Sequence, residues 1–174
     1  MKINLQDLVL NTETLKAGQK ILLSGVIYTA RDAAHKRMIT MLDSEEKTPI
    51  DLINAAIYYC GPTPAKPGAV IGSCGPTTSS RMDAFTPRIL KEGVKILVGK
   101  GARSNDVVNS IKKNSALYFV ATGGVAALIS KTVKRADLIA FEDLGPEAIY
   151  RLEVKDMPLI VAIDSFGNNV FARG

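Results

Sequence analysis

The feature that most constrains the fold is an alternation of short apolar runs with helical segments in the middle of the chain. Apolar runs at residues 94–98 and 117–121 predict buried strands. Residues 104–114 and 124–131 predict helices, the first of which begins at the capping residue Ser104. Because strands that alternate with helices pair in parallel through right-handed crossovers, the sequence predicts an α/β fold with a mostly parallel core sheet.

Further elements are predicted on both sides of this alternation. Helices are expected over residues 30–42, near Ser79 or Ser80, and from the Thr86-Pro87 pair to Gly93. Strand-like runs occur over residues 20–28, 50–52, 55–60, 69–73, 138–141, 148–154, 159–164 and 169–172. The length of 174 residues suits one large domain, so we expect a single domain over residues 1–174.

The chain is poor in metal-binding side chains. Its one histidine and two cysteines cannot supply a four-thiolate site, a three-histidine zinc site or a disulfide scaffold. Most ligands of any metal centre would therefore come from another chain. Cys60 and Cys74 each precede a Gly-Pro turn, and their spacing matches no zinc motif, so we interpret them as small buried apolar residues.

The sequence contains no apolar segment typical of a signal peptide or of a membrane span. We therefore predict a cytoplasmic protein with reduced thiols. Lys and Arg number 22 against 17 Asp and Glu, and the net charge of +5 suits an anionic partner, although such a surplus also serves solubility. Basic residues do not cluster and no nucleic-acid-binding motif occurs, so nucleic acid is not the expected partner.

Loops that follow strands of a parallel sheet are favoured ligand sites, and the first such loop contains Arg31, Asp32 and His35. On a helix, Arg31 and His35 share a face. Arg31 would stand in the first turn, where a cation opposes the helix dipole. Such a break of a local rule is often functional, although a solvated helix start would have the same sequence.

The second loop, residues 75–83, combines a Gly-Pro turn, four consecutive hydroxyl residues from Thr77 to Ser80, and Arg81. Exposed backbone N–H groups and hydroxyls there could bind an anion, and Arg81 could bind a carboxylate through two parallel hydrogen bonds. An ordinary helix cap needs one or two of these hydroxyls, so the others favour a binding role.

Two further loops contain glycine pairs. In Gly99-Lys100-Gly101 the glycines would let the backbone approach a ligand closely, and Lys100 would project a compact cation, although a flexible turn with a solvated lysine has the same sequence. Thr122-Gly-Gly124 could bind an anion or simply allow close packing of a strand on a helix. Together, the cations of these loops suit a small polycarboxylate or a phosphate.

At residues 31–35 (Arg-Asp-Ala-Ala-His), 75–83 and 99–101 the sequence resembles the iron–sulfur (class I) fumarase and L-tartrate dehydratase family. It is similar to the β-subunit, equivalent to the C-terminal domain of single-chain members, over nearly the whole chain. The resemblance implies a three-layer β/β/α swivelling domain that closes over a 4Fe-4S cluster held by a partner α-subunit. It also implies reversible hydration of fumarate to malate in a hetero-oligomer, for example a dimer of heterodimers.

The same resemblance implies roles for individual residues. Arg31, Arg81 and Lys100 match the family's residues that bind the carboxylates of a C4 dicarboxylate substrate. Thr77 matches the base proposed to take a proton from the carbon beside the second carboxylate. Three neighbours would support these groups: Asp32, His35 and Thr78.

Several alternatives stay open at this point. Within the family, L-tartrate is the main rival to fumarate as the substrate. Outside it, the chain could be a non-catalytic anion-binding module or a basic nucleic-acid-binding module, whose affinity would fall steeply with salt.

Overall fold

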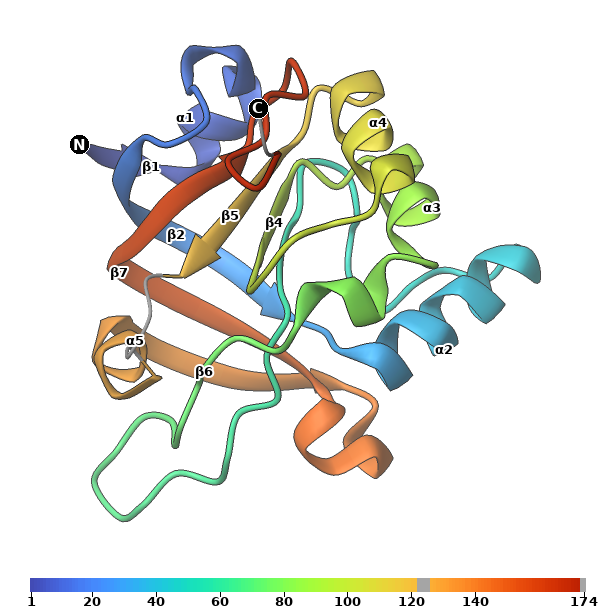
Figure 1. Ribbon diagram of the computed structural model, residues 1–174. Helices are drawn as coiled ribbons and strands as arrows, with labels where there is room; N and C mark the ends of the chain where they lie inside the picture. The colour runs from blue at the N-terminus through green and yellow to red at the C-terminus, as the bar shows by residue number, and fades with distance from the viewer. Residues whose placement is uncertain (122–125, 173–174) are drawn as a thin grey trace.

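The computed structural model describes residues 1–121 and 126–172. Its strands are β1 (Lys2–Asn4), β2 (Lys20–Thr29), β3 (Ala56–Tyr58), β4 (Ile96–Gly99), β5 (Leu117–Ala121), β6 (Val133–Ala140) and β7 (Ile149–Ile163). Its α-helices are α1 (Leu5–Leu10), α2 (Asp32–Asp43), α3 (Thr86–Lys91), α4 (Asn105–Lys113) and α5 (Ala126–Thr132). Three short 3₁₀ helices are η1 (Thr12–Thr14), η2 (Ser79–Met82) and η3 (Glu142–Glu147). The helices α2, α3 and α4 gather on one side of the strands (Figure 1).

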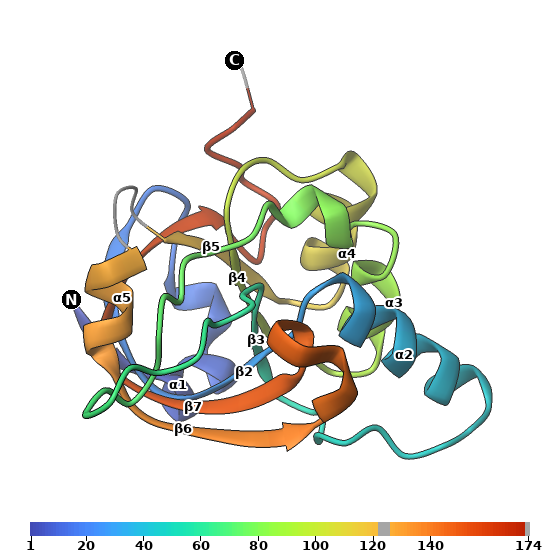
Figure 2. The same cartoon turned by 90° about the horizontal axis from the view of Figure 1, so that it is seen from below.

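The strands form one sheet in the order β1-β2-β3-β4-β5-β7-β6. Neighbours from β1 to β5 are parallel, whereas β7 is antiparallel to β5, β6 and β2. The additional pairing of β2 with β7 closes the sheet into a barrel-like ring (Figures 1 and 2). The predicted α/β class with a mostly parallel sheet is confirmed, and the closure is a feature that the sequence did not indicate.

Strand β7 closes the ring because it is long enough to pair with three other strands. It runs without interruption for 15 residues and pairs with β2 along most of its length. The two strands predicted over residues 148–154 and 159–164 are therefore one strand. Between them, Asp156 has a φ of 55° at an irregularity of the β2 pairing, and Pro158 keeps its register against β2.

Three predicted strands are wrong. Residues 50–52 are irregular, and their apolar side chains enter the core without pairing with the sheet. Residues 69–73 belong to a loop in which Gly72 donates a hydrogen bond to the carbonyl of Thr63 rather than to a strand. Residues 169–172 contribute one isolated bridge to the end of β7. An apolar run can be buried without a ladder partner, so strand propensity alone was not sufficient.

Other differences concern the ends of elements. β1 and α1 were not predicted. β6 begins at Val133 instead of residue 138, because its first positions include the exposed charged residues Lys134 and Arg135, which interrupt the apolar pattern used to predict a strand. The helix predicted over residues 124–131 is observed as α5, and its first two positions lie outside the described residues. Near Ser79 the structure has the single turn η2 instead of an α-helix.

The alternating middle of the chain agrees with the sequence prediction. β5 has the predicted bounds, and β2, β3 and β4 lie within one or two residues of theirs. The Ser104 side chain accepts a hydrogen bond from the backbone N–H of Val107 at 3.3 Å, so it caps α4 as expected. Buried Val107 and Ile111, four residues apart, attach that helix to the sheet.

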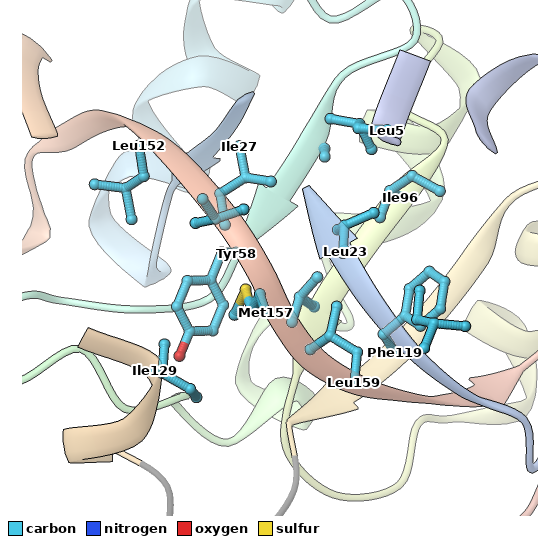
Figure 3. Close-up of a cluster of buried hydrophobic side chains, with 14 of the residues drawn as sticks. Leu5, Leu23, Ile27, Tyr58, Ile96, Phe119, Ile129, Leu152, Met157 and Leu159 are labelled. Atoms are coloured by element: carbon cyan, nitrogen blue, oxygen red, sulfur yellow. The ribbon is translucent and has the colours of Figure 1, made fainter. Parts of the chain in front are cut away.

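Two apolar cores lie on opposite faces of the ring, because successive strand residues point to opposite faces. One fills the ring (Figure 3) with alternate strand residues such as Leu23, Ile27, Tyr58, Ile96, Phe119, Leu152 and Leu159. The other lies between the ring and α2, α3 and α4.

Because strands β2, β3 and β4 are parallel, the loops that follow them open at a single edge of the sheet. Among the described residues, no helix has the length and apolarity needed to cross a membrane.

Candidate functional site

The predicted site residues follow three neighbouring parallel strands. Arg31 comes two residues after β2, and Lys100 comes directly after β4. Thr77 donates its backbone N–H to the carbonyl of Tyr59, the residue after β3, at 2.7 Å. The parallel order of β2, β3 and β4 thus brings segments that are far apart in the sequence to one edge of the ring.

Arg31 lies at the start of α2, but not in its first turn as the sequence predicted. It is the N-cap residue, with extended backbone and no side-chain cap hydrogen bond, and the helix begins at Asp32. Its Nε lies 4.0 Å from Asp32 Oδ1 and 3.8 Å from Glu147 Oε1, so two carboxylates offset the cation near the positive end of the helix. Arg31 Nε and Asp32 Oδ1 are both buried and make no hydrogen bond.

Asp32 connects this region with η2. Both Nε and Nη2 of Arg81 contact Asp32 Oδ2, at 2.9 and 2.8 Å. The Arg81 side chain is 53% exposed, and that of Asp32 is 31% exposed. Arg31, Asp32 and Arg81 therefore form one charged strip, although Asp32 and Arg81 are 49 residues apart in the sequence.

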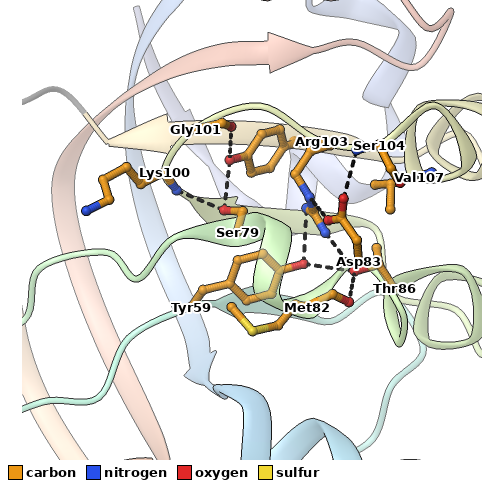
Figure 4. A network of polar contacts seen from close by, with 11 residues as sticks. Tyr59, Ser79, Met82, Asp83, Thr86, Lys100, Gly101, Arg103, Ser104 and Val107 are labelled. Carbon is orange, nitrogen blue, oxygen red and sulfur yellow. Dashed lines mark hydrogen bonds and ion pairs between the residues drawn. The ribbon is translucent and has the colours of Figure 1, made fainter.

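Lys100 is joined to η2 through backbone contacts. Ser79 donates its N–H to the Lys100 carbonyl at 2.9 Å, and its hydroxyl oxygen accepts the Lys100 N–H at 2.9 Å. Thr78 and Lys100 also form a parallel bridge. The exposed Lys100 side chain extends away from these contacts (Figure 4). A Cβ at Gly99 would lie 1.9 Å from Ser79 Oγ, so this close approach requires glycine.

The four hydroxyl residues differ in their surroundings. Ser79 is fully buried and serves the backbone contact with Lys100, so it is not available to a ligand. Thr77 is half-buried, whereas Thr78 and Ser80 are exposed. The structure thus leaves Thr77, Thr78 and Ser80 as hydroxyls at the surface.

His35 contacts the backbone of Arg31. Its Nδ1–H donates to the Arg31 carbonyl at 2.8 Å, and its ring packs edge-on against Tyr59 and stacks with Phe85. Nε2 is buried without a hydrogen-bond partner. Burial lowers the pKa of His35 to about 4, since it removes water from the charged form. The ring is therefore neutral near pH 7 and holds the backbone that carries Arg31.

The sequence reasoning missed Arg103, whose guanidinium is fully buried behind the site (Figure 4). It donates from Nε to Asp83 at 2.7 Å, from Nη2 to Thr86 Oγ1 at 2.7 Å and from Nη1 to the Tyr59 hydroxyl at 3.2 Å. The guanidinium also lies 4.9 Å from the centre of the Tyr118 ring. The sequence showed Arg103 as the end of a glycine-rich turn, and no local pattern indicated that it would be buried.

Comparison with known proteins assigns the family. All 174 residues of the chain match the family model described as "Fumarase C-terminus". The chain belongs to this family. A provisionally named L(+)-tartrate dehydratase subunit beta of Methanocaldococcus jannaschii is 42% identical over 167 residues, which cover 92% of this chain and 86% of that protein.

Larger relatives contain a similar segment. Fumarate hydratase 2 of Leishmania major is 35% identical over 158 residues, or 90% of this chain and 28% of that protein. The aerobic class I fumarate hydratase of Escherichia coli K12 is 34% identical over 156 residues, or 88% of this chain and 28% of that protein. This fumarase C-terminus chain thus spans less than a third of the fumarate hydratases it matches.

The described residues of this fumarase C-terminus chain do not fit a cluster held by the chain alone. Residues 1–121 and 126–172 contain no group of three or more His, Cys, Asp or Glu side chains placed to hold a metal ion. Cys60 and Cys74 are free and buried in the core, with their Sγ atoms 3.1 Å apart. They are too few for a four-thiolate site. The predicted backbone site at Thr122-Gly-Gly124 lies outside the described residues.

Proposed function

We propose that the chain is the β-subunit of an iron–sulfur hydro-lyase that reversibly hydrates fumarate to malate. The observation that carries this proposal is the convergence of Arg31, Arg81 and Lys100, from three loops, on one edge of the ring. A cationic edge suits the two carboxylates of a C4 dicarboxylate. Membership of the fumarase C-terminus family supports the same reaction class.

In this proposal the three cations divide the work of substrate binding. Arg31 has a buried Nε without a hydrogen bond, and a carboxylate oxygen would satisfy that donor. Arg81 is held by Asp32 on one edge of its guanidinium and offers its exposed remainder to the second carboxylate. Lys100 adds a compact charge from the neighbouring loop.

Thr77 is the candidate catalytic base. It would take a proton from the carbon beside a substrate carboxylate as water is eliminated from malate, and return a proton in the reverse direction. A threonine hydroxyl is a weak base by itself, so nearby cations would have to stabilise its alkoxide. Its backbone bond to Tyr59 fixes the position of the segment. Three residues would support the site: Asp32, His35 and Thr78.

We further propose that a partner α-subunit holds the 4Fe-4S cluster, since the described residues of this chain do not fit one. Residues 1–174 would act as a single domain, whose ring and outer helices form a three-layer β/β/α unit that swivels over that partner. The assembly would be a hetero-oligomer, for example a dimer of heterodimers. We also propose a cytoplasmic location, in which both thiols stay reduced.

L-tartrate is a second candidate substrate. It is favoured by one observation, the 42% identity to a protein provisionally named as a tartrate dehydratase β-subunit over 86% of its length. L-tartrate carries the same two carboxylates as malate and would use the same cations.

Anaerobic reconstitution tests the proposal. The chain is expressed alone and with a candidate α-subunit, and each preparation is assayed with fumarate, L-tartrate and mesaconate. We expect no activity and no iron in the isolated chain, and hydration or dehydration of one dicarboxylate in the complex. A complex that forms and carries the cluster but converts none of the three would contradict the proposal.

A further inference from the structure

A pair of cysteines lies at the base of the long loop between β3 and η2. Cys60 follows β3 and Cys74 ends the loop, and their Sγ atoms are 3.1 Å apart. The two residues are 1% and 0% exposed. The intervening loop, residues 61–73, extends from the ring on the side of α5 and β6 (Figures 1 and 2).

Contacts other than the thiol pair hold the two arms of this loop together. The Tyr58 hydroxyl donates to the Cys74 carbonyl at 2.5 Å. Thr63 donates its N–H to the Ser73 carbonyl at 3.0 Å, and its hydroxyl accepts the Ser73 N–H at 2.7 Å. A Cβ at Gly72 would lie 2.2 Å from Thr63 Oγ1, so the arms touch closely. The two sulfur atoms are therefore kept adjacent by the fold.

We propose that Cys60 and Cys74 form a redox-modifiable dithiol that a peroxide converts into an intramolecular disulfide. In the first step, one sulfur attacks an oxygen of hydrogen peroxide, the O–O bond breaks, and a sulfenic acid and water form. In the second step, the other sulfur attacks the sulfenic sulfur, the S–O bond breaks, and a second water leaves. Two thiols are oxidised, one peroxide is reduced, and no other reactant is needed.

The surroundings favour the internal disulfide over other products. Burial excludes bulky external thiols from a sulfenic acid at either residue, whereas the second sulfur is already in contact. The chain contains no other cysteine, so no other intramolecular pairing exists. The hydrogen bond to Cys74, followed by burial, raises the pKa of Cys60. The pair therefore reacts more slowly than an exposed thiol and stays reduced without a peroxide.

The disulfide would tie the loop beside the candidate site. A Cβ at Gly61, next to Cys60, would lie 3.0 Å from Arg31 Cδ, so the start of the loop packs on that arginine. Closing a covalent ring of this size restricts the unfolded chain, and we expect the thermal midpoint to rise by roughly 5–10 °C. The inference needs no catalytic activity and does not depend on the proposed function.

Mass spectrometry of the full chain tests the inference. Trypsin does not cleave after Lys66, because Pro67 follows it, so both cysteines lie in the single tryptic peptide of residues 48–81. This peptide contains no methionine that peroxide could oxidise. After treatment of the folded chain with hydrogen peroxide, we expect this peptide to lose two hydrogens, about 2 Da, and to regain them with a phosphine reductant. The same disulfide can be detected in the whole protein: after peroxide treatment the chain should stay monomeric, and neither cysteine should react with an alkylating reagent after denaturation.

Two single variants serve as controls. In Cys60→Ser and Cys74→Ser the remaining thiol has no partner, so peroxide should give a sulfenic acid without the mass loss. Dimedone should trap this sulfenic acid when the chain is unfolded in its presence. The inference is overturned if the wild-type peptide keeps both free thiols, gains oxygen on both sulfurs, or pairs between chains. A thermal midpoint that is unchanged after verified disulfide formation would overturn the expected restriction of the loop.

Discussion

Arg103 and Asp83 form a buried ion pair between the two loops that carry Lys100 and Arg81. Arg103 Nε lies 2.7 Å from Asp83 Oδ1, and the two side chains are 0% and 17% exposed. Asp83 Oδ2 also accepts the backbone N–H of Ser104 at 2.8 Å. One carboxylate therefore ties the end of η2 to the loop that follows β4.

Replacement of Arg103 tests this connection. Arg103→Met should lower the free energy of unfolding by about 3 kcal/mol, because the largely buried Asp83 carboxylate is left without its ion partner. Arg103→Lys keeps the charge but loses the planar guanidinium, so its loss in free energy of unfolding should be smaller than that of Arg103→Met. Urea unfolding of each variant measures the effect. Arg37→Met is the matched control, because its ion pair with Asp143 is exposed, and an equal loss in that variant would contradict the prediction.

Arg81 tests the proposed substrate site in the reconstituted complex. Arg81→Ala should lower kcat/KM by at least about 30-fold, since in the proposed complex the bound dicarboxylate would bury the Arg81 contact, and truncation of a buried charge contact costs roughly 2–5 kcal/mol. Arg88→Ala is the control, since Arg88 is likewise paired with carboxylates, here Asp43 and Glu92, but lies on α3. The measurement is the steady-state kcat/KM of both variants. A decrease of no more than about threefold for Arg81→Ala, or an equal decrease for Arg88→Ala, would refute the role of Arg81 in substrate binding.

The contact between Gly99 and Ser79 predicts a coupled pair of substitutions. Gly99→Ala should lower the free energy of unfolding by about 1–3 kcal/mol, because its methyl group collides with Ser79 Oγ. Removal of that oxygen in Ser79→Ala should recover part of the cost, so the double variant should lose less than the sum of the single variants. Thermal and urea unfolding of all four proteins measures the coupling, and strict additivity would show that the two residues do not meet.

His35 predicts a stability change below neutral pH. Its pKa of about 4 in the folded chain lies below the ordinary value of 6.5, so between these values the unfolded chain binds the extra proton. The stabilisation is therefore complete above pH 6.5 and is lost as the pH falls toward 4, by about 3 kcal/mol. His35→Asn keeps a donor for the Arg31 carbonyl but does not titrate.

The measurement is the urea midpoint of both proteins at pH 7.5, 6.5, 5.5 and 4.5 at constant ionic strength, with these values spanning roughly the titration range. The wild type should be the more stable protein at high pH and should lose that advantage as the pH falls. Asp164 also titrates with a shifted pKa: burial raises it, but hydrogen bonds from the Asn168 side chain and three backbone N–H groups together lower it by more, so the net shift is downward. Asp164 is present in both proteins, so its contribution cancels in the comparison. If the urea midpoints of the two proteins changed in parallel with pH, His35 would not be the titrating group.

The sequence was sufficient for features that depend on local pattern and strand direction. It placed the Ser104 cap, the bounds of β5 and the common edge at which Arg31 and Lys100 lie. It could not supply features that depend on long-range pairing. The continuity of β7 requires β2 as a partner, and the burial of Arg103 requires Asp83 from another loop. A local window contains neither partner.

The pairing of β7 with β2 has a consequence for how the chain folds. It joins residues 20–28 to residues 151–160, so the ring cannot close during synthesis until the last part of the chain is available. Until then, β2 and β5 each present an unpaired edge of backbone N–H and carbonyl groups, which other chains can pair with. Variants that delay the formation of β7 should therefore reduce soluble yield more than their effect on final stability would suggest.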